Sequence, residues 1–111
     1  MEIITAAEYD VPVVWIVEHN NMHGITWHGS KMVGDKRPMD SVRYQKKLDI
    51  AGIARAMGLT AFVVEKAGEM TDILPRALAI PGPSLIEVRV DGDIPPPLGD
   101  RAKTVAGFVE K

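Results

Sequence analysis

One stretch of the chain, residues 18–30, gathers the side chains that are best suited to chemistry. It contains all three histidines and both asparagines of the 111-residue sequence. Imidazole nitrogens bind transition metals, whereas amide and carbonyl oxygens suit harder ions such as Mg²⁺. The stretch is therefore the first place to look for a functional site.

A metal site made by His19, His23 and His28 is one interpretation of this stretch. His19 and His23 are four residues apart, the spacing that puts two imidazoles on one helix face in the zinc peptidase motif H-E-x-x-H. Asn20 stands where that motif has its catalytic glutamate, so the site would lack a general base. Gly24 and the β-branched run before the stretch also disfavour a helix. The simpler interpretation is a polar loop whose histidines face water or form local hydrogen bonds.

The strongest strand signal comes immediately before these polar residues. Residues 11–17 form a continuous β-branched and aromatic run, which predicts a strand covered on both faces. Residues 1–9 predict a short helix that Asp10 and Pro12 end. No helical or strand period is sustained between residues 20 and 47. We expect a long polar loop there, and such loops are usually functional or disordered.

Helical and strand patterns alternate in the rest of the chain. The expected helices cover residues 49–58 and 69–80, and the expected strands cover residues 61–65 and 85–90. The apolar stripes of the two helices are Ile50, Ile53, Ala54 and Met57, then Met70, Ile73, Leu74, Ala77 and Leu78. Asp49 is the predicted N-cap of the first helix, and Gly58 suits the position just beyond its end. Pro75 should kink the second helix or confine it to its second half.

This alternation predicts an α/β fold with a parallel sheet, βαβ crossovers and a partial doubly wound arrangement. Ligands of open α/β sheets bind beyond the carboxyl ends of the strands, which points to the loop after Val17. We expect Trp15 and Phe62 in the core, whereas Trp27 could anchor the loop or line a site. A short helix is expected from Asp100.

The composition excludes several classes of function. Hydrophobic residues make up 46% and charged residues 25% of the sequence, as in folded globular proteins. The formal charge of −2 gives no electrostatic reason to bind nucleic acid or acidic membranes. No apolar run has the length of a membrane span, and the absence of cysteine excludes disulfides and thiolate zinc sites. We expect a soluble, cytoplasmic protein with neither nucleic acid nor membrane among its partners.

Four segments resemble, in order and spacing, the diphosphate-binding domain of thiamine-diphosphate enzymes of the acetolactate-synthase type. Residues 2–20 are similar to the family's helix E-(I/L)-x-T-A-x-x-Y, followed by x-(L/I/V)-P-V and a strand ending in Asn-Asn. Residues 49–58 resemble its D-(F/I)-x-x-(L/I)-A-x-A-(F/M)-G helix, and residues 83–91 its P-x-L-I-E-V-x-V-D strand. Residues 94–101 resemble the tail of its acetolactate-synthase-like members. The resemblance implies that residues 1–91 are the carboxy-terminal part of this domain and residues 92–111 its tail.

The resemblance implies a cofactor site in the stretch after the strand. Without gaps, the family's Asn-Asn pair falls on His19 and Asn20; a shifted register would use Asn20 and Asn21 instead. Asn20 would then bind Mg²⁺ with its side chain, and Met22 with its backbone carbonyl. The family's next glycine falls on Gly24, which supports the first register.

Three consecutive residues, His23, Gly24 and Ile25, would lie along the thiamine diphosphate, with Gly24 allowing a close approach of the backbone. The family's Gly-Asp-Gly turn, which should precede Met1, and the pyrimidine-domain glutamate do not appear in the sequence. The turn would supply the charged ligand of the metal, so no catalytic residue is expected here, and binding by this chain alone should be poor.

The expected function is that of a carboxy-terminal fragment of an enzyme that acts on a 2-oxo acid as a transferase or lyase. The alternatives are a subunit completed by a partner chain and an α/β binding module without a cofactor. A strand made for neighbours on both edges also predicts self-association, for example by strand exchange between copies.

Overall fold

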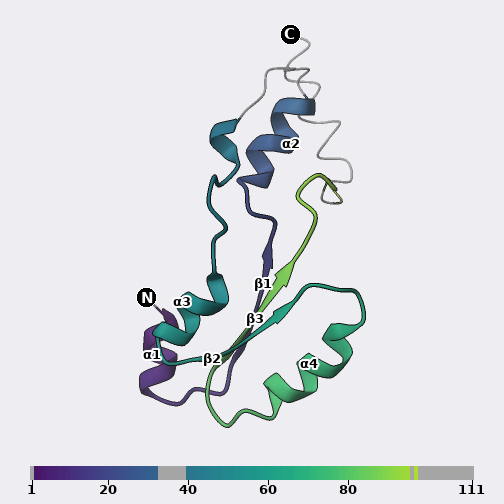
Figure 1. Ribbon diagram of the computed structural model, residues 1–111. Helices are drawn as coiled ribbons and strands as arrows, with labels where there is room; N and C mark the ends of the chain where they lie inside the picture. Colours follow the sequence, from purple (N-terminus) through teal and green to yellow (C-terminus); the bar gives the residue numbers. More distant parts are fainter. Residues whose placement is uncertain (1, 33–39, 96, 98–111) are drawn as a thin grey trace. The chain divides into compact units, whose positions relative to one another are not determined.

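The computed structural model describes residues 2–32, 40–95 and 97 (Figure 1). Its elements are α1 (Glu2–Glu8), β1 (Val14–His19), α2 (Gly24–Met32), the 3₁₀ turn η1 (Asp40–Val42), α3 (Ile50–Ala56), β2 (Thr60–Val64), α4 (Glu69–Leu78) and β3 (Ser84–Arg89). The expected helix from Asp100 lies outside the described residues. Of the helices in the described part, none has both the length and the apolar character that crossing a bilayer requires.

The chain packs as two compact units, each made of separate stretches of sequence. The sheet unit comprises Met1–His19 and Leu48–Val90, and the α2 unit comprises Asn20–Lys47 and Asp91–Lys111. The division into residues 1–91 and 92–111 concerns the assignment of each segment to a family domain, and it stays a prediction.

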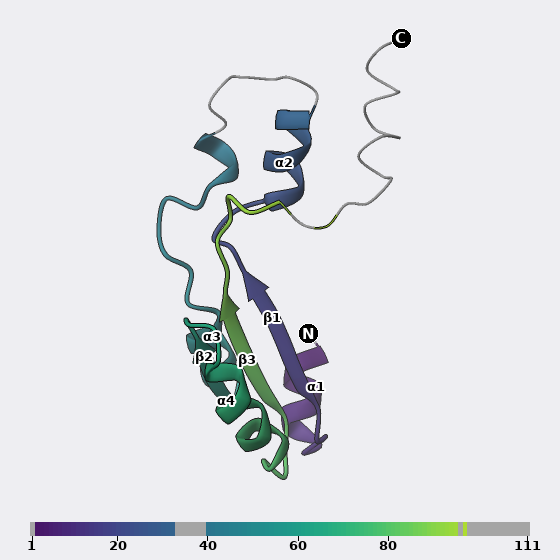
Figure 2. The same cartoon turned by 90° about the vertical axis from the view of Figure 1, so that its right-hand side faces the viewer.

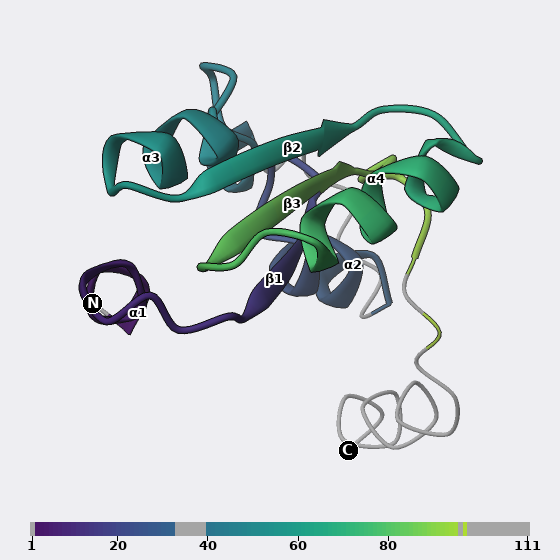
Figure 3. The ribbon, with the colours of Figure 1, turned by 90° about the horizontal axis from the view of Figure 1, so that it is seen from below.

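The sheet unit contains three parallel strands in the order β1-β3-β2 (Figure 3). β3 pairs with β1 from Val14↔Ser84 to His19↔Arg89, and the two strands run side by side in Figure 2. On its other edge, β3 pairs with β2 from Thr60↔Ser84 onward. Sequential strands joined by helices around a parallel sheet confirm the predicted α/β class.

The boundaries of β1 differ from the prediction at both ends. The strand begins at Val14 rather than at residue 11, and Pro12 has no N–H to donate to a strand ladder. It continues through Glu18 and His19, which were expected to end it. Pairing with β3 compensates for their polar character, since the strand ends only where this pairing ends.

Two hydrophobic clusters cover the opposite faces of the sheet. Neighbouring residues of β3 point to different faces, so Leu85 belongs to the cluster with α3 and α1, and Ile86 to the cluster with α4. Trp15 packs against the first cluster and Phe62 against the second, as predicted. The central strand β3 is therefore covered on both faces. β1 is not, against the prediction, because Ile16, which is in register with Ile86 on the α4 face, is 53% exposed.

The cap predictions for α3 are confirmed. The Asp49 carboxylate accepts a hydrogen bond from the Gly52 N–H at 2.8 Å, and Gly58 has a φ of 91° just beyond the C-cap. Within the expected stripe, however, Ile53 is 50% exposed. The buried positions of α3 are Ala54, which the stripe includes, and Ala51, which it omits.

Pro75 does not confine α4 to its second half, because the helix runs from Glu69 through Pro75 to Leu78. A proline inside a helix costs about 3 kcal/mol. The side chains of Met70, Ile73 and Leu74 pack against the α4-side cluster and offset this cost. Leu78, which was expected to point inward, is 65% exposed.

Part of the expected polar loop is the helix α2, so the prediction of an irregular segment is wrong there. In α2, His28 is buried, Gly24, Trp27, Gly29 and Ser30 are half-buried, and Ile25, Thr26 and Lys31 are exposed. Hydropathy does not detect the helix, because its more protected positions carry glycine, serine, an indole and an imidazole instead of aliphatic side chains.

Candidate functional site

Asn20 follows the last residue of β1 directly, at the carboxyl end of the parallel sheet. Its side-chain Oδ1 accepts a hydrogen bond from the Met22 N–H at 3.2 Å, which closes a tight turn. Asn21 between them has a φ of 55°, a left-handed conformation that asparagine tolerates. The turn thus fixes the side chain of Asn20 relative to the backbone of Met22.

Hydrogen bonds to a second segment hold this turn in place. The His23 N–H donates to the Val42 carbonyl at 2.7 Å, and the Tyr44 N–H donates to the Asn21 carbonyl at 3.1 Å. The Met22 side chain is buried. Its carbonyl oxygen receives no hydrogen bond from any of the described residues. The turn therefore presents one partly used amide oxygen and one free carbonyl oxygen.

Gly24 begins α2 and leaves no room for a side chain. A Cβ at this position would lie 2.6 Å from Nδ2 of Asn20. The first intrahelical bond runs from the Trp27 N–H to the His23 carbonyl, so the N–H groups of Gly24 and Ile25 have no partner within the helix. Such first-turn N–H groups attract anions.

Two of the predicted cofactor residues are open to solvent. Ile25 is 88% exposed, more than any other large hydrophobic residue in the described part of the chain. The His23 side chain is exposed as well, and its ring contacts Tyr44 edge-on at a centroid distance of 5.2 Å. Both side chains are accessible to a ligand.

His19 is buried at the end of β1 and is paired with a carboxylate. Its Nδ1 lies 2.8 Å from Oε1 of Glu87, which is fully buried in the middle of the sheet. Its Nε2 is also buried and has no hydrogen-bond partner among the described residues. A buried polar atom without a hydrogen-bond partner costs about 1–3 kcal/mol of folding free energy, so the burial of this Nε2 is locally destabilising.

Glu87 joins three elements of the sheet unit. Its second oxygen accepts the N–H of Ala51 in the first turn of α3 at 2.7 Å, and Arg89 donates to Oε1 at 3.3 Å. Burial raises the pKa of Glu87. The hydrogen bonds from His19, Ala51 and Arg89 outweigh burial and hold that pKa below its ordinary value.

The histidines have separate partners and do not form a common metal site. His19 contacts Glu87, His23 contacts Tyr44, and the buried His28 contacts the Gly92 carbonyl through Nε2 at 3.0 Å. No group of three histidine, cysteine or acidic side chains within residues 2–32, 40–95 and 97 is placed to hold a metal. The three-histidine interpretation therefore has no support in the structure.

Trp27 anchors the α2 unit. Lys31 and Arg43 both lie over its ring, with their cationic groups 4.3 and 4.5 Å from the ring centroid. Its Nε1 is buried without a partner in the described part of the chain. The indole is a packing centre for two cationic side chains.

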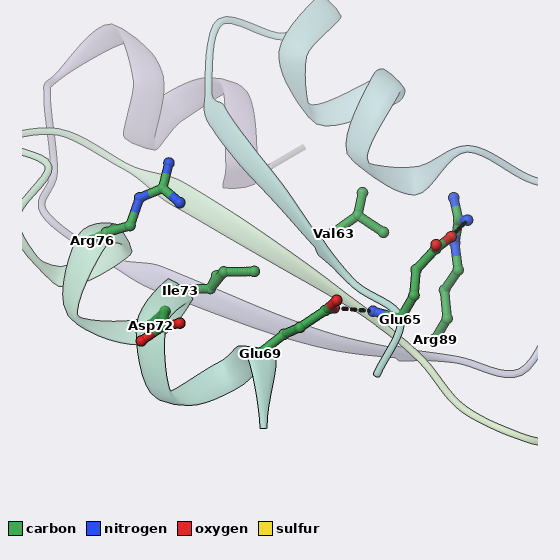
Figure 4. Close-up of a pocket in the computed structure, with 7 residues that line it drawn as sticks. All are labelled: Val63, Glu65, Glu69, Asp72, Ile73, Arg76 and Arg89. Atoms are coloured by element: carbon green, nitrogen blue, oxygen red, sulfur yellow. Dashed lines mark hydrogen bonds and ion pairs between the residues drawn. The ribbon is translucent and has the colours of Figure 1, made fainter. Parts of the chain in front are cut away.

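A groove of about 550 Å³ lies in the sheet unit, and none of the predicted cofactor or metal residues lines it (Figure 4). The seven residues that line it are Val63, Glu65, Glu69, Asp72, Ile73, Arg76 and Arg89. Several of its charges are already engaged. Glu65 pairs with Arg89, and Glu69 accepts the N–H groups of Glu65 and Lys66. The groove is a solvated edge of the sheet whose charged side chains largely bind one another or the neighbouring backbone.

Sequence reasoning did not identify Glu87 or Gly92, and it named His28 without its partner. Glu87 contacts His19 and Ala51 across 68 and 36 positions, and Gly92 contacts His28 across 64 positions. The resemblance to the family's P-x-L-I-E-V-x-V-D strand includes Glu87, but nothing near it in the sequence indicates its partner.

Comparisons with known proteins show the family of the chain. The family described as "Thiamine pyrophosphate enzyme, C-terminal TPP binding domain" matches residues 1–88; thiamine pyrophosphate is another name for thiamine diphosphate. A mitochondrial acetolactate synthase from Schizosaccharomyces pombe is 31% identical over 90 residues, which cover 81% of this chain and 13% of that protein. The acetolactate synthase large subunit from Pyropia yezoensis is 28% identical over 89 residues, covering 80% and 15%.

The fold has a counterpart among solved structures. Benzoylformate decarboxylase from Polynucleobacter necessarius superposes with a TM-score of 0.74 at 23% identity, covering 85% of this chain and 17% of that one. The chain spans only about a seventh of the length of its curated relatives. It belongs to the family of thiamine pyrophosphate enzymes and falls within their C-terminal TPP binding domain.

Proposed function

We propose that residues 20–25 form part of a thiamine-diphosphate and Mg²⁺ site in an enzyme that acts on 2-oxo acids. The observation that carries the proposal is the turn after β1, which fixes the Asn20 side chain two residues from a Met22 carbonyl that accepts no hydrogen bond from the described residues. The first turn of α2 follows immediately.

The oxygen donors of the turn fit a hard divalent ion. Mg²⁺ prefers oxygen ligands and commonly shares its coordination sphere with phosphate oxygens. The Asn20 oxygen uses one lone pair for the Met22 N–H and keeps another, while the Met22 carbonyl has no donor among the described residues. Asn20 would thus hold the ion with its side chain and Met22 with its backbone.

The start of α2 fits the cofactor's anionic group. The N–H groups of Gly24 and Ile25, which have no partner within the helix, suit diphosphate oxygens, and the exposed Ile25 and His23 side chains can contact an organic ligand. When bound, thiamine diphosphate supplies the nucleophilic carbon for 2-oxo acid chemistry. The protein's share is to bind and orient it.

Both protein ligands are neutral, so they do not offset the charge of the ion. We propose that a carboxylate from another segment completes the site, and that residues 1–111 alone bind the cofactor weakly. That segment belongs either to a longer polypeptide or to a partner chain that makes this chain a non-catalytic subunit. The short share of the curated relatives that this chain spans is compatible with both. Reading the coding DNA for a Gly-Asp-Gly turn in frame, together with co-purification, separates the two.

An NMR titration of the chain with thiamine diphosphate and Mg²⁺ tests the site. We expect the amide signals of residues 20–25 to shift, with unphosphorylated thiamine as the control ligand. Asn20→Ala should weaken the apparent affinity by about tenfold or more. Asn21→Gly removes the amide that donates to the Tyr44 carbonyl at 3.2 Å but keeps the left-handed backbone accessible, so it should weaken the affinity less than Asn20→Ala.

The two variants also test the register of the motif. If Asn21→Gly abolishes the shifts and Asn20→Ala does not, the shifted register is correct and the assignment of Asn20 is wrong. A micromolar dissociation constant for residues 1–111 alone would contradict the proposed weak binding.

A further inference from the structure

We infer that Gly92 and His28 are positioning residues that hold the Asn20–Met22 turn in its ligand-binding geometry. This inference rests on the proposed function of that turn. Its evidence is a set of contacts within the α2 unit between the turn, α2 and the segment that follows β3. We call Met22, His28 and Gly92 together the Gly92 clamp.

Gly92 touches the turn so closely that no side chain fits there. A Cβ at this position would overlap Cε of Met22 and lie 3.1 Å from its Sδ and 2.9 Å from the carbonyl oxygen of Asn20. The end of a methionine side chain can rotate away. The Asn20 carbonyl is backbone, so it cannot yield unless the whole turn moves.

His28 fixes the position of Gly92 from the other side. The imidazole is 6% exposed, and its Nε2 lies 3.0 Å from the Gly92 carbonyl oxygen. A carbonyl only accepts hydrogen bonds, so Nε2 carries the proton and donates. This contact ties α2 to the backbone of the segment that presses on the turn.

A second attachment holds the same segment. Asp93 forms an ion pair with Arg43 at 2.5 Å, and the Asp93 N–H donates to the Asp91 carboxylate at 2.9 Å. Arg43 in turn pairs with Met22 in an isolated antiparallel bridge. The turn therefore lies between two strips of chain that are joined to each other.

The clamp controls where the proposed metal ligands lie. Displacement of Gly92 releases the Met22 side chain and the Asn20 carbonyl, and hence the turn that carries both ligand oxygens. Loss of a group that orients a metal ligand without touching the metal typically lowers the metal affinity by about 10–100-fold. Coupling is reciprocal, so ligand binding at the turn should also slow hydrogen exchange of the Gly92 and Asp93 amides.

Glycine variants separate positioning from folding. Gly92→Ala should shift the amide signals of Met22 and His23 without any ligand, and should weaken binding of thiamine diphosphate with Mg²⁺ by about tenfold. Gly29→Ala is the matched control in the same unit, since a Cβ there meets nothing within 4 Å. For the imidazole, His28→Gln keeps an N–H donor and should retain the wild-type signals, whereas His28→Leu should not.

Each result decides the inference. If Gly92→Ala leaves the signals of residues 20–23 unchanged, or if His28→Leu gives the same signals as His28→Gln, then Gly92 and His28 do not position the turn. This conclusion holds even if the wild type binds the ligand. If the wild-type loop signals do not respond to thiamine diphosphate with Mg²⁺, the proposed function fails. The ligand-free signals then still report whether the clamp holds the turn.

Discussion

At the scale of single residues, Glu87 is the most constrained ionisable group that the structure describes in the sheet unit. It is fully buried, and its two oxygens bind His19, Ala51 and Arg89. A buried carboxylate is tolerated only when such partners satisfy it. The residue therefore ties the end of β1 and the start of α3 to the central strand.

Replacement of Glu87 should change both stability and its dependence on pH. Glu87→Gln should lower the free energy of unfolding at neutral pH by about 1–3 kcal/mol, because the amide cannot accept all of these hydrogen bonds. The pKa of Glu87 is lowered in the folded state. Its contribution is therefore complete above the pKa of the unfolded chain and is lost as the pH falls through the folded value.

Urea unfolding at neutral and acidic pH measures this effect, with the exposed Glu18→Gln on β1 as the matched control. The wild type and Glu18→Gln should both lose stability on acidification, and Glu87→Gln should lose less. Equal acid sensitivity in all three proteins would show that Glu87 does not contribute in this way.

At the scale of elements, sequence patterns identify the parts whose signals are local. The strands around Trp15, Phe62 and Ile86, the Asp49 cap and the left-handed Gly58 all follow from residue type and spacing. The path of α4 through Pro75 could not be predicted in this way, since it depends on packing against the sheet.

The residues of the candidate site also differ in whether local sequence signals predict them. Asn20, Met22 and Gly24 can be proposed from the sequence because they follow a recognisable strand in a recognisable register. Glu87 and Gly92 cannot, because their partners lie 64 to 68 residues away and leave no periodic signal. The sequence pattern does not predict α2, because its more protected positions, Gly24 and residues 27–30, carry no aliphatic side chain.

The two glycines of α2 should respond in opposite ways to alanine. Gly24→Ala should displace the Asn20 side chain and weaken cofactor binding, because the new Cβ lies 2.6 Å from Nδ2. Gly29→Ala meets no atom within 4 Å and should stabilise α2 by about 0.5–1 kcal/mol. Hydrogen exchange of the α2 amides measures the second effect, and the NMR titration measures the first.

Comparing these two variants separates the effect of the close contact between Gly24 and Asn20 from the effect of helix propensity. Alanine favours a helix at both positions, so propensity alone would stabilise both. If Gly24→Ala bound thiamine diphosphate as well as the wild type, the contact between Gly24 and Asn20 would have no role in the site.

At the scale of the whole molecule, the two edges of the sheet are protected differently. On β2, Arg55 donates to the Ala61 carbonyl at 2.8 Å, and Glu69 accepts the N–H of Glu65 just beyond the strand. No side chain within the described part of the chain makes such a contact to the outer edge of β1, where Ile16 is 53% exposed. We therefore propose that β1 is the edge through which copies associate.

Light scattering at increasing protein concentration tests this proposal. Ile16→Lys should reduce self-association, because a charge on an edge strand opposes pairing with another chain. Ile53→Lys is the matched control, since Ile53 is 50% exposed on α3 rather than on the sheet edge. A wild-type chain that stays monomeric, or equal effects of both variants, would contradict the proposal.

The central claim is that the divalent ion of a thiamine-diphosphate site binds at Asn20 and Met22. Paramagnetic broadening by Mn²⁺, an ion with similar oxygen ligands, locates the metal directly when thiamine diphosphate is present. We predict that the amide signals of residues 20–24 broaden first. If the signals of the acidic groove at Glu65, Glu69 and Asp72 broaden while those of residues 20–24 stay sharp, the claim is wrong.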